Sequence, residues 1–348
     1  MLLAAVIVVG LNQLGRVPVR APFVNGEKSR YGKAKAITQR HPGGADVVVV
    51  GNSAAQFGID AKQLARALRL PNQGGAVPEV INVAVPAGDP ASSLWFWRHL
   101  TRADLLKTKL LIVGVAPIDF IPDSASRDFA LRYLFDAKDA CWLLRNRRPS
   151  EAAELLLYRA LPLYAYRQAV RNLITRQPAP PPLPDGENNR MWCTPAYSRA
   201  FQGYRIDNFK ERCLEQLIVD ARGRGVQVLL LALPVHPSLQ TVTEGLVFPG
   251  TVKGVTSLRW TETTKAPLWI FNHAIGDLAR RHQVPFFNYL TKPDSRRFTY
   301  ADPPHLNHQG AQRFTAELAR RLTRELTSAQ RRRSQGLTGA ARQDNGAS

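Results

Sequence analysis

Cysteine is scarce in this chain of 348 residues, which has three: Cys141, Cys193 and Cys213. No two of them are spaced as zinc ligands are, and an odd number cannot all pair within the chain. The count excludes a disulfide-rich scaffold but leaves one disulfide and the redox compartment open. We expect Cys141 and Cys213 to fill the core.

The chain also lacks an apolar run long enough to span a bilayer, which takes about 20 residues. Residues 1–11 form an uninterrupted apolar run, with no basic region before it and no small-x-small cleavage site after it. The run is either the outer part of a signal anchor that starts upstream or a buried first element. We favour the anchor, because residues 12–40 are polar and basic and contain Pro18 and Pro22, as a tether would. This places an extracytoplasmic domain at the cell membrane, with a cytoplasmic location as the alternative.

The sequence contains no Gly-rich phosphate loop, zinc signature or dinucleotide fingerprint, so we expect neither a cofactor nor a bound metal. Its net charge of +20 comes from 47 Lys and Arg against 27 Asp and Glu. No basic stripe interleaved with aromatic residues accompanies this charge, which argues against a nucleic-acid partner. The charge favours an anionic surface such as membrane headgroups or an acidic glycan. A basic surface without any partner is the alternative.

What the chain does have is a pattern of short apolar runs that alternate with helical segments. In the first run, residues 46–53, four valines are followed by Gly51, Asn52 and Ser53. Consecutive β-branched residues of this kind are typical of a strand buried on both faces, as in a parallel sheet. Similar runs lie at residues 79–85, 109–115, 225–233 and 284–288. Such alternation predicts βαβ units and therefore an α/β domain.

The helical segments and the composition divide the chain into three parts. Helices are expected at residues 61–70, 92–106, 207–222, 268–282 and 308–326, and within an insertion at 137–145 and 151–176. The predicted parts are an anchor and tether at 1–40, an α/β domain at 41–326 and a disordered basic tail at 327–348. The insertion, about 124–206, ends in a proline-rich stretch and is expected to form a cap or a partner surface over the sheet.

Three residues far apart in sequence suggest nucleophilic catalysis. Ser53 lies at the carboxyl end of a predicted parallel strand, where open α/β sheets place their ligand sites. Asp302 and His305 are three residues apart ahead of the last helix, which lets the carboxylate fix the tautomer of the imidazole. A serine hydroxyl needs such a base. Each residue alone is as well explained by helix capping or by an ordinary surface histidine, so the combination carries the hypothesis.

At these residues the sequence resembles the SGNH (GDSL-type) hydrolase superfamily, in its branch of cell-envelope acyltransferases and esterases. Residues 51–53 match the first block, residues 302–310 match the last, and residues 82–89 match the second. The resemblance implies a flavodoxin-like three-layer sandwich with a five-stranded parallel sheet, no cofactor, and a triad of Ser53, His305 and Asp302. It also implies an oxyanion hole formed by the N–H groups of Ser53 and Gly88, with Ala87 as an alternative to Gly88 because the spacing is one residue longer than usual.

Two positions depart from the family pattern. The first block reads Gly-Asn-Ser where Gly-Asp-Ser is usual, and residues 113–119 lack the asparagine that the third block offers to the oxyanion. Asn52 and the N–H of Ala54 are candidates to replace that donor. His236, in a Pro-Val-His-Pro segment, and Asp119 are further candidates for substrate binding, although each also fits an ordinary loop or turn residue.

Together these features predict a serine esterase or O-acyltransferase (EC 3.1.1 or 2.3.1) that works through an acyl-enzyme. The resemblance and the charge favour an acylated cell-envelope glycan or a small ester as substrate, the membrane surface as a contact of the N-terminus, and a membrane acyltransferase as partner. The alternative is a non-catalytic scaffold of the same fold that binds a glycan or a protein. The missing asparagine favours that alternative, whereas the intact serine, aspartate and histidine oppose it.

Overall fold

The structure is a computed structural model of the whole chain. It describes residues 25–70, 76–100, 106–122, 134–160, 201, 204–239, 266–290 and 295–344. Within these ranges, side chains are described for residues 31–328.

A five-stranded parallel sheet forms the centre of the molecule, in the order β2-β1-β3-β4-β5. The strands are β1 (Val47–Val50), β2 (Val80–Asn82), β3 (Leu110–Gly114), β4 (Gln227–Ala232) and β5 (Phe286–Asn288). All four valines of β1 are buried, as expected of a strand covered on both faces. The chain moves from β1 outward to β2 and then crosses back to β3, so β1 lies where the strand order reverses. The predicted α/β class and five-stranded parallel sheet are confirmed.

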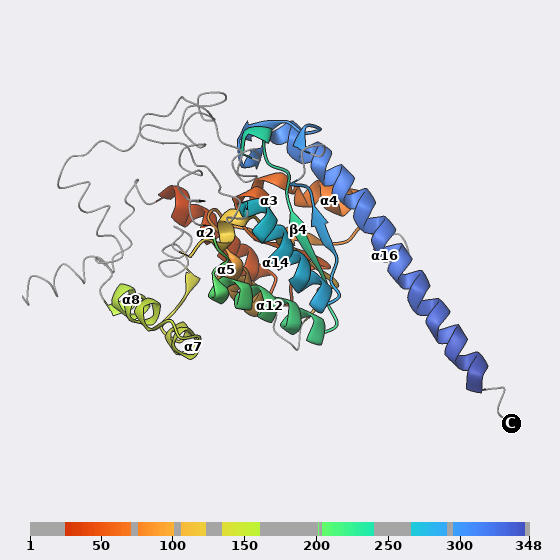
Figure 1. Cartoon of the computed structure of the whole chain (residues 1–348), viewed down its shortest axis with the longest axis horizontal. Coiled ribbons are helices and arrows are strands. Elements are labelled where there is room, and N and C mark those ends of the chain that lie inside the picture. Colours follow the sequence, from red (N-terminus) through yellow and green to blue (C-terminus); the bar gives the residue numbers. More distant parts are fainter. Residues whose placement is uncertain are drawn as a thin grey trace, which may run out of the picture.

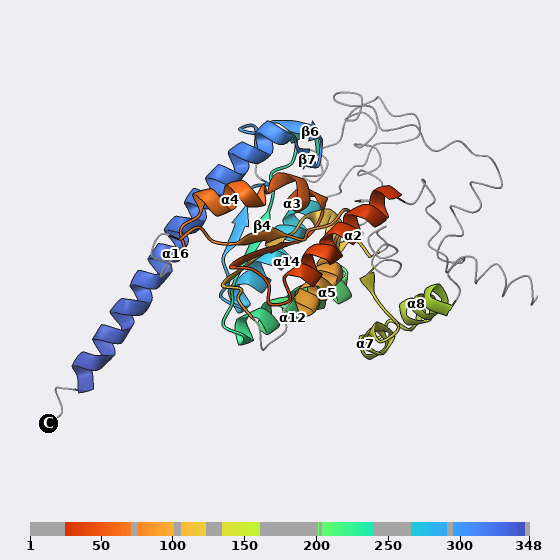
Figure 2. The same cartoon turned by 180° about the vertical axis from the view of Figure 1, so that it is seen from behind.

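Helices cover both faces of this sheet, which gives three layers (Figures 1 and 2). Val48 and Val50 belong to one buried cluster and Val47 and Val49 to another, because successive strand side chains point to opposite faces. The first cluster is covered by α2 (Asn25–Arg40), α5 (Pro90–Leu100), α12 (Asn208–Gly223) and α14 (Pro267–Arg281). The second is covered by α3 (Ser53–Gly58), α4 (Ala61–Ala67) and α16 (His308–Asp344).

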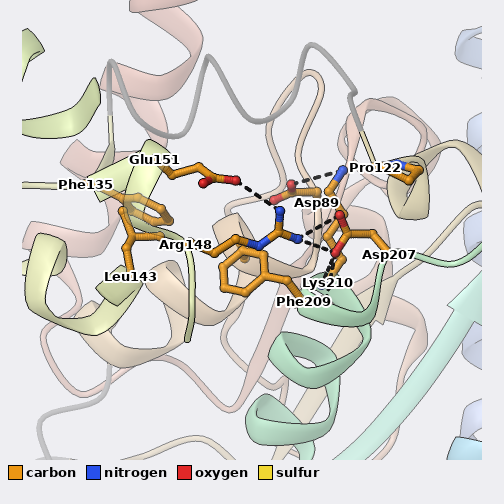
Figure 3. Close-up of a pocket in the computed structure, with 10 residues that line it drawn as sticks. Asp89, Pro122, Phe135, Leu143, Arg148, Glu151, Asp207, Phe209 and Lys210 are labelled. Carbon is orange, nitrogen blue, oxygen red and sulfur yellow. Dashed lines mark hydrogen bonds and ion pairs between the residues drawn. The ribbon is translucent and has the colours of Figure 1, made fainter. Parts of the chain in front are cut away.

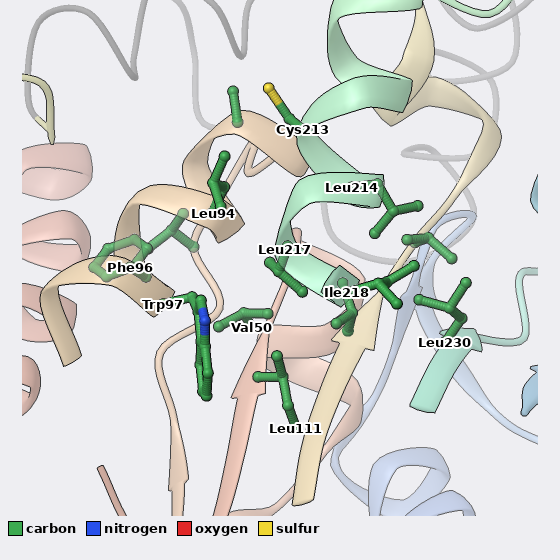
Figure 4. Packing of buried hydrophobic residues seen from close by; sticks show 14 of the residues in the cluster. Val50, Leu94, Phe96, Trp97, Leu111, Cys213, Leu214, Leu217, Ile218 and Leu230 are labelled. Atoms are coloured by element: carbon green, nitrogen blue, oxygen red, sulfur yellow. The ribbon is translucent and has the colours of Figure 1, made fainter. Parts of the chain in front are cut away.

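Figure 4 shows how the first cluster packs, with α5 and α12 side by side over the strands. Trp97 is fully buried and its indole N–H donates to Asp220 at 2.7 Å, so α5 and α12 share a polar contact as well as apolar ones. Cys213 is buried here, as expected. Cys141 is exposed instead, which corrects the expectation that it fills the core.

Two predicted segments differ from the structure at the ends of the described chain. The part of the expected tether that is described forms helix α2, whose Tyr31 is 1% exposed and donates to the Pro86 carbonyl at 2.8 Å. Its sequence looks polar because only a few side chains of the helix face the core. The expected disordered tail is also wrong as far as residue 344, because α16 continues through it. Ala, Gln and Arg dominate that stretch, and such residues extend a helix that packing has already nucleated.

The insertion contributes two described helices, α7 (Asp139–Arg145) and α8 (Pro149–Ala160). Its remaining predicted helix and proline-rich stretch, Cys193 and the apolar run at 1–11 lie outside the described residues. None of the described helices combines the length and the apolar character needed to cross a membrane.

Candidate active site

Ser53 lies at the first position of α3, and only Gly51 and Asn52 separate it from the carboxyl end of β1. Asn52 precedes it as the N-cap, and its side-chain oxygen accepts the Ala55 N–H at 3.2 Å. The first turn of a helix has N–H groups without partners inside the helix. Ser53 is therefore held in a fixed turn, at the strand where the sheet order reverses and open α/β folds place their ligands.

Asp302 and His305 face each other across a small antiparallel hairpin, β6 (Tyr300–Asp302) and β7 (His305–Leu306), which the sequence did not predict. Pro303 and Pro304 form its loop. One carboxylate oxygen of Asp302 accepts the backbone N–H of His305 at 3.0 Å. The imidazole Nδ1 lies 2.7 and 2.8 Å from the two carboxylate oxygens. This contact places the Nδ1 proton toward Asp302 and leaves Nε2 as an acceptor.

The structure brings Ser53 together with Asp302 and His305. Nε2 of His305 lies 2.8 Å from the Ser53 hydroxyl oxygen, although these two residues are 252 apart in sequence. The His305 and Asp302 side chains are 22% and 20% exposed, so the group is accessible from solvent. Phe57, on α3, packs its ring edge-on against the imidazole with centroids 5.3 Å apart. Sequence reasoning did not identify Phe57, whose only signal is its place one helical turn after Ser53.

The backbone around Ser53 depends on close approach of neighbouring turns. The N–H of Gly88 donates to the Val85 carbonyl at 3.0 Å, so in this structure the turn itself uses that group. Ala87 has φ +49°, in the left-handed region that a residue with a side chain rarely adopts. A side chain at Gly88 would begin 2.3 Å from the Gly51 carbonyl oxygen.

Asn52 and Asp119 form a buried pair that local sequence patterns could not reveal. Asp119 lies in the short helix η2 (Pro117–Phe120) after β3 and is 5% exposed, like Asn52. The Asn52 amide nitrogen donates to both Asp119 oxygens, at 2.9 and 2.8 Å. Burial raises the pKa of Asp119 to about 7, against the opposing effect of hydrogen bonds from Asn52 and Ala116. Asp119 thus caps its own turn by accepting the Ala116 N–H, and it is too deeply buried to be an exposed pocket-lining group.

His236 follows β4 and reaches the hairpin from another element. Its backbone N–H donates to the Pro303 carbonyl at 2.8 Å, and its ring packs edge-on against Tyr300. The ring Nδ1 lies 2.8 Å from the Ser238 hydroxyl. His236 therefore supports the loop that carries Asp302 and His305.

Beside Asp89, charged side chains line a pocket between α12 and the insertion (Figure 3). Arg148 donates to Asp207 at 2.6 and 2.8 Å and to Glu151 at 3.0 Å. The Lys210 amine lies 3.6 Å from Asp89 and donates to the Ile121 carbonyl at 2.9 Å. Within the described residues, no three His, Cys, Asp or Glu side chains come together as metal ligands would.

In comparisons by sequence, no family model and no curated protein matches this chain. Among solved structures, TesA shares 14% identity, with 80% of this chain and 98% of that chain covered and a TM-score of 0.35. A GDSL-like lipase from Bacteroides thetaiotaomicron VPI-5482 shares 12% identity over 86% of this chain and 99% of that chain, with a TM-score of 0.37.

Proposed function

We propose that this chain is an SGNH-type serine esterase with Ser53 as nucleophile. The observation that carries the proposal is the unbroken hydrogen-bonded series from Ser53 through His305 to Asp302, with contacts of 2.8 and 2.7 Å. A hydroxyl, an imidazole and a carboxylate in this order form the arrangement that activates serine for acyl transfer.

In the proposed reaction, the Ser53 oxygen attacks the ester carbonyl carbon while Nε2 of His305 takes the hydroxyl proton. Asp302 holds the Nδ1 proton and stabilises the imidazolium that results. The tetrahedral intermediate collapses, His305 returns the proton to the leaving alcohol, and the acyl group remains on Ser53. A second acceptor, deprotonated by His305, then attacks the acyl-enzyme and frees the serine.

The oxyanion would form near the amino end of α3, where the N–H of Ser53 has no partner inside the helix. We assign the second donor to the N–H of Ala87, because the N–H of Gly88 is bonded to Val85. The left-handed Ala87 backbone supports this assignment, since strained residues cluster at functional sites. Each donor of this kind contributes about 10²–10³ in rate.

We extend the proposal to an acylated glycan of the cell envelope as substrate, with water or a sugar hydroxyl as second acceptor. The net charge of +20 supports an anionic surface or polymer nearby. The apolar run at 1–11 supports attachment at a membrane, where a membrane acyltransferase would be a suitable partner.

The test is covalent labelling with a fluorophosphonate, together with hydrolysis of p-nitrophenyl acetate, in the wild type and in Ser53→Ala. We expect the wild type to be labelled and to hydrolyse the ester, and Ser53→Ala to do neither. Mass spectrometry of the labelled peptide should place the adduct on Ser53.

Asp302→Asn is the matched control, because it keeps the shape of the side chain but cannot hold the Nδ1 proton in the same way. We expect its labelling rate to fall on the order of 10⁴-fold. Labelling that persists in Ser53→Ala would contradict the nucleophile assignment. A wild type inert to both reagents would favour the non-catalytic scaffold.

A further inference from the structure

The side chain of Asn52, directly before the proposed nucleophile, uses both of its polar atoms inside the protein. Its oxygen caps α3 by accepting the Ala55 N–H, and its nitrogen donates to the Asp119 carboxylate. Asn52 is 5% exposed, and these contacts fix its orientation directly before Ser53. Asn52 thus links the turn after β1 to the turn after β3.

Asp119 is fixed just as firmly on its own side. One of its oxygens accepts the Ala116 N–H at 2.7 Å, which ties the carboxylate to the backbone of its own turn. Two charged groups from other segments act on it electrostatically, Asp89 before α5 and Lys210 on α12. The charge of Asp119, in turn, adds to the effect of burial in raising the pKa of Tyr204. A carboxylate surrounded this closely has little freedom to turn toward other partners.

The hydrogen-bonding capacities of the two side chains show that their identities could be exchanged. An aspartate at position 52 could still cap α3, because Asp and Asn are equally good N-caps. An asparagine at position 119 could accept the Ala116 N–H with its oxygen and donate with its nitrogen to the carboxylate then present at position 52. A single change Asn52→Asp would instead place two carboxyl groups against each other in a buried site, where they can pair only if one of them keeps its proton.

We propose that Asp119 is a positioning residue that holds Asn52 and, through Asn52, the turn that carries Ser53. The pair works in either orientation, as long as one member is an amide and the other a carboxylate. This inference rests on the proposed function, since it concerns the reactivity of Ser53. In this role Asp119 maintains the turn that carries Ser53 and does not bind substrate at an exposed position.

The test is a double-mutant cycle of wild type, Asn52→Asp, Asp119→Asn and the exchanged double variant. The readouts are the second-order rate of fluorophosphonate labelling and the melting temperature. We expect Asn52→Asp to slow labelling by about tenfold or more and Asp119→Asn to slow it several-fold, within the range for directly coupled residues. The double variant should recover to within about threefold of wild type.

A matched control separates positioning from general stability. Asn288, at the end of β5, also combines an amide donor contact to a side chain, Asn272 at 2.9 Å, with an acceptor contact from a backbone N–H, that of Leu290. We expect labelling of Asn288→Asp to remain within about twofold of wild type, whatever the change in its melting temperature.

The outcomes distinguish this inference from the proposed function. A double variant whose rate equals the product of the two single effects would overturn the pairing, even if wild-type labelling supports the esterase. If Asn52→Asp does not fold, the double variant must still label faster than Asp119→Asn, and a slower rate overturns the inference. A wild type that is not labelled would overturn both proposals.

Discussion

At the scale of single residues, the site depends on backbone approaches that only glycine permits. Gly51 has φ +137°, and a side chain there would begin 2.6 Å from the Gly114 carbonyl oxygen. Gly88 lies against Gly51 in the same way. The Gly51 contact brings the turn after β1 against the end of β3, and the Gly88 contact brings the turn after β2 against the turn after β1.

Gly88→Ala should therefore be costly, because its Cβ would meet backbone that cannot rotate away. We expect the free energy of unfolding to fall by about 1–3 kcal/mol, the usual cost of overpacking. Urea denaturation measures it. Gly223→Ala is the control, since no atom lies within 4 Å of its Cβ and it ends helix α12. That variant should be neutral or stabilised by up to about 1 kcal/mol. Equal stability of the two variants would contradict the close approach.

At the scale of elements, helix α12 is connected to the insertion through Asp207. The Asp207 side chain caps the helix by accepting the Phe209 N–H at 2.7 Å and binds Arg148 with both oxygens. It is 7% exposed, whereas the Arg148 side chain is 26% exposed. The Asp207 carboxylate thus caps the start of α12 and also neutralises Arg148, which directly precedes α8.

Asp207→Ala should destabilise the protein twice over, by removing the cap and by leaving Arg148 without its main partner. A lost cap costs about 1 kcal/mol, and a broken buried pair adds about 1–3 kcal/mol here because Arg148 is partly exposed. We expect Asp207→Asn to lose roughly half as much, since asparagine retains the cap. Thermal and urea unfolding of both variants check this. An asparagine variant as unstable as the alanine variant would show that the cap contributes nothing.

At the scale of the whole molecule, one buried carboxylate couples stability to pH. Asp119 lies between the helical layer and the ends of β1 and β3, and burial raises its pKa to about 7 from 3.8. Below the unfolded value the group is protonated in both states. Between the two values it ionises only on unfolding, so its contribution to stability is lost as pH rises through this window. Above about pH 7 no further loss is expected.

Asp119→Asn should remove this part of the pH dependence. A shift of about three units corresponds to roughly 4 kcal/mol at most. We therefore expect wild type to lose more stability than Asp119→Asn between pH 4 and pH 7, and the two curves to run parallel above pH 7. Denaturant unfolding at half-unit pH intervals measures the difference. Curves parallel from pH 4 upward would contradict the raised pKa of Asp119.

Much of the architecture could be predicted from the sequence, because it depends on local patterns. The four valines of β1 specify a strand buried on both faces, and the positions of the other apolar runs predict the sheet. The spacing of Asp302 and His305 predicts their contact. Parallel topology then suggests that Ser53 lies at the same sheet edge, and the structure places the three side chains within hydrogen-bonding distance.

Tertiary structure decided what local patterns do not encode. The contact of Asn52 with Asp119 joins residues 67 apart, and neither has a sequence signal for the other. Helix α2 looked like a tether because its buried face is narrow, and only packing shows that Tyr31 belongs to the core. Periodicity specifies which face of an element is apolar. Which side chains meet across elements depends on how closely the backbones approach, and at this site the glycines at 51 and 88 set that distance.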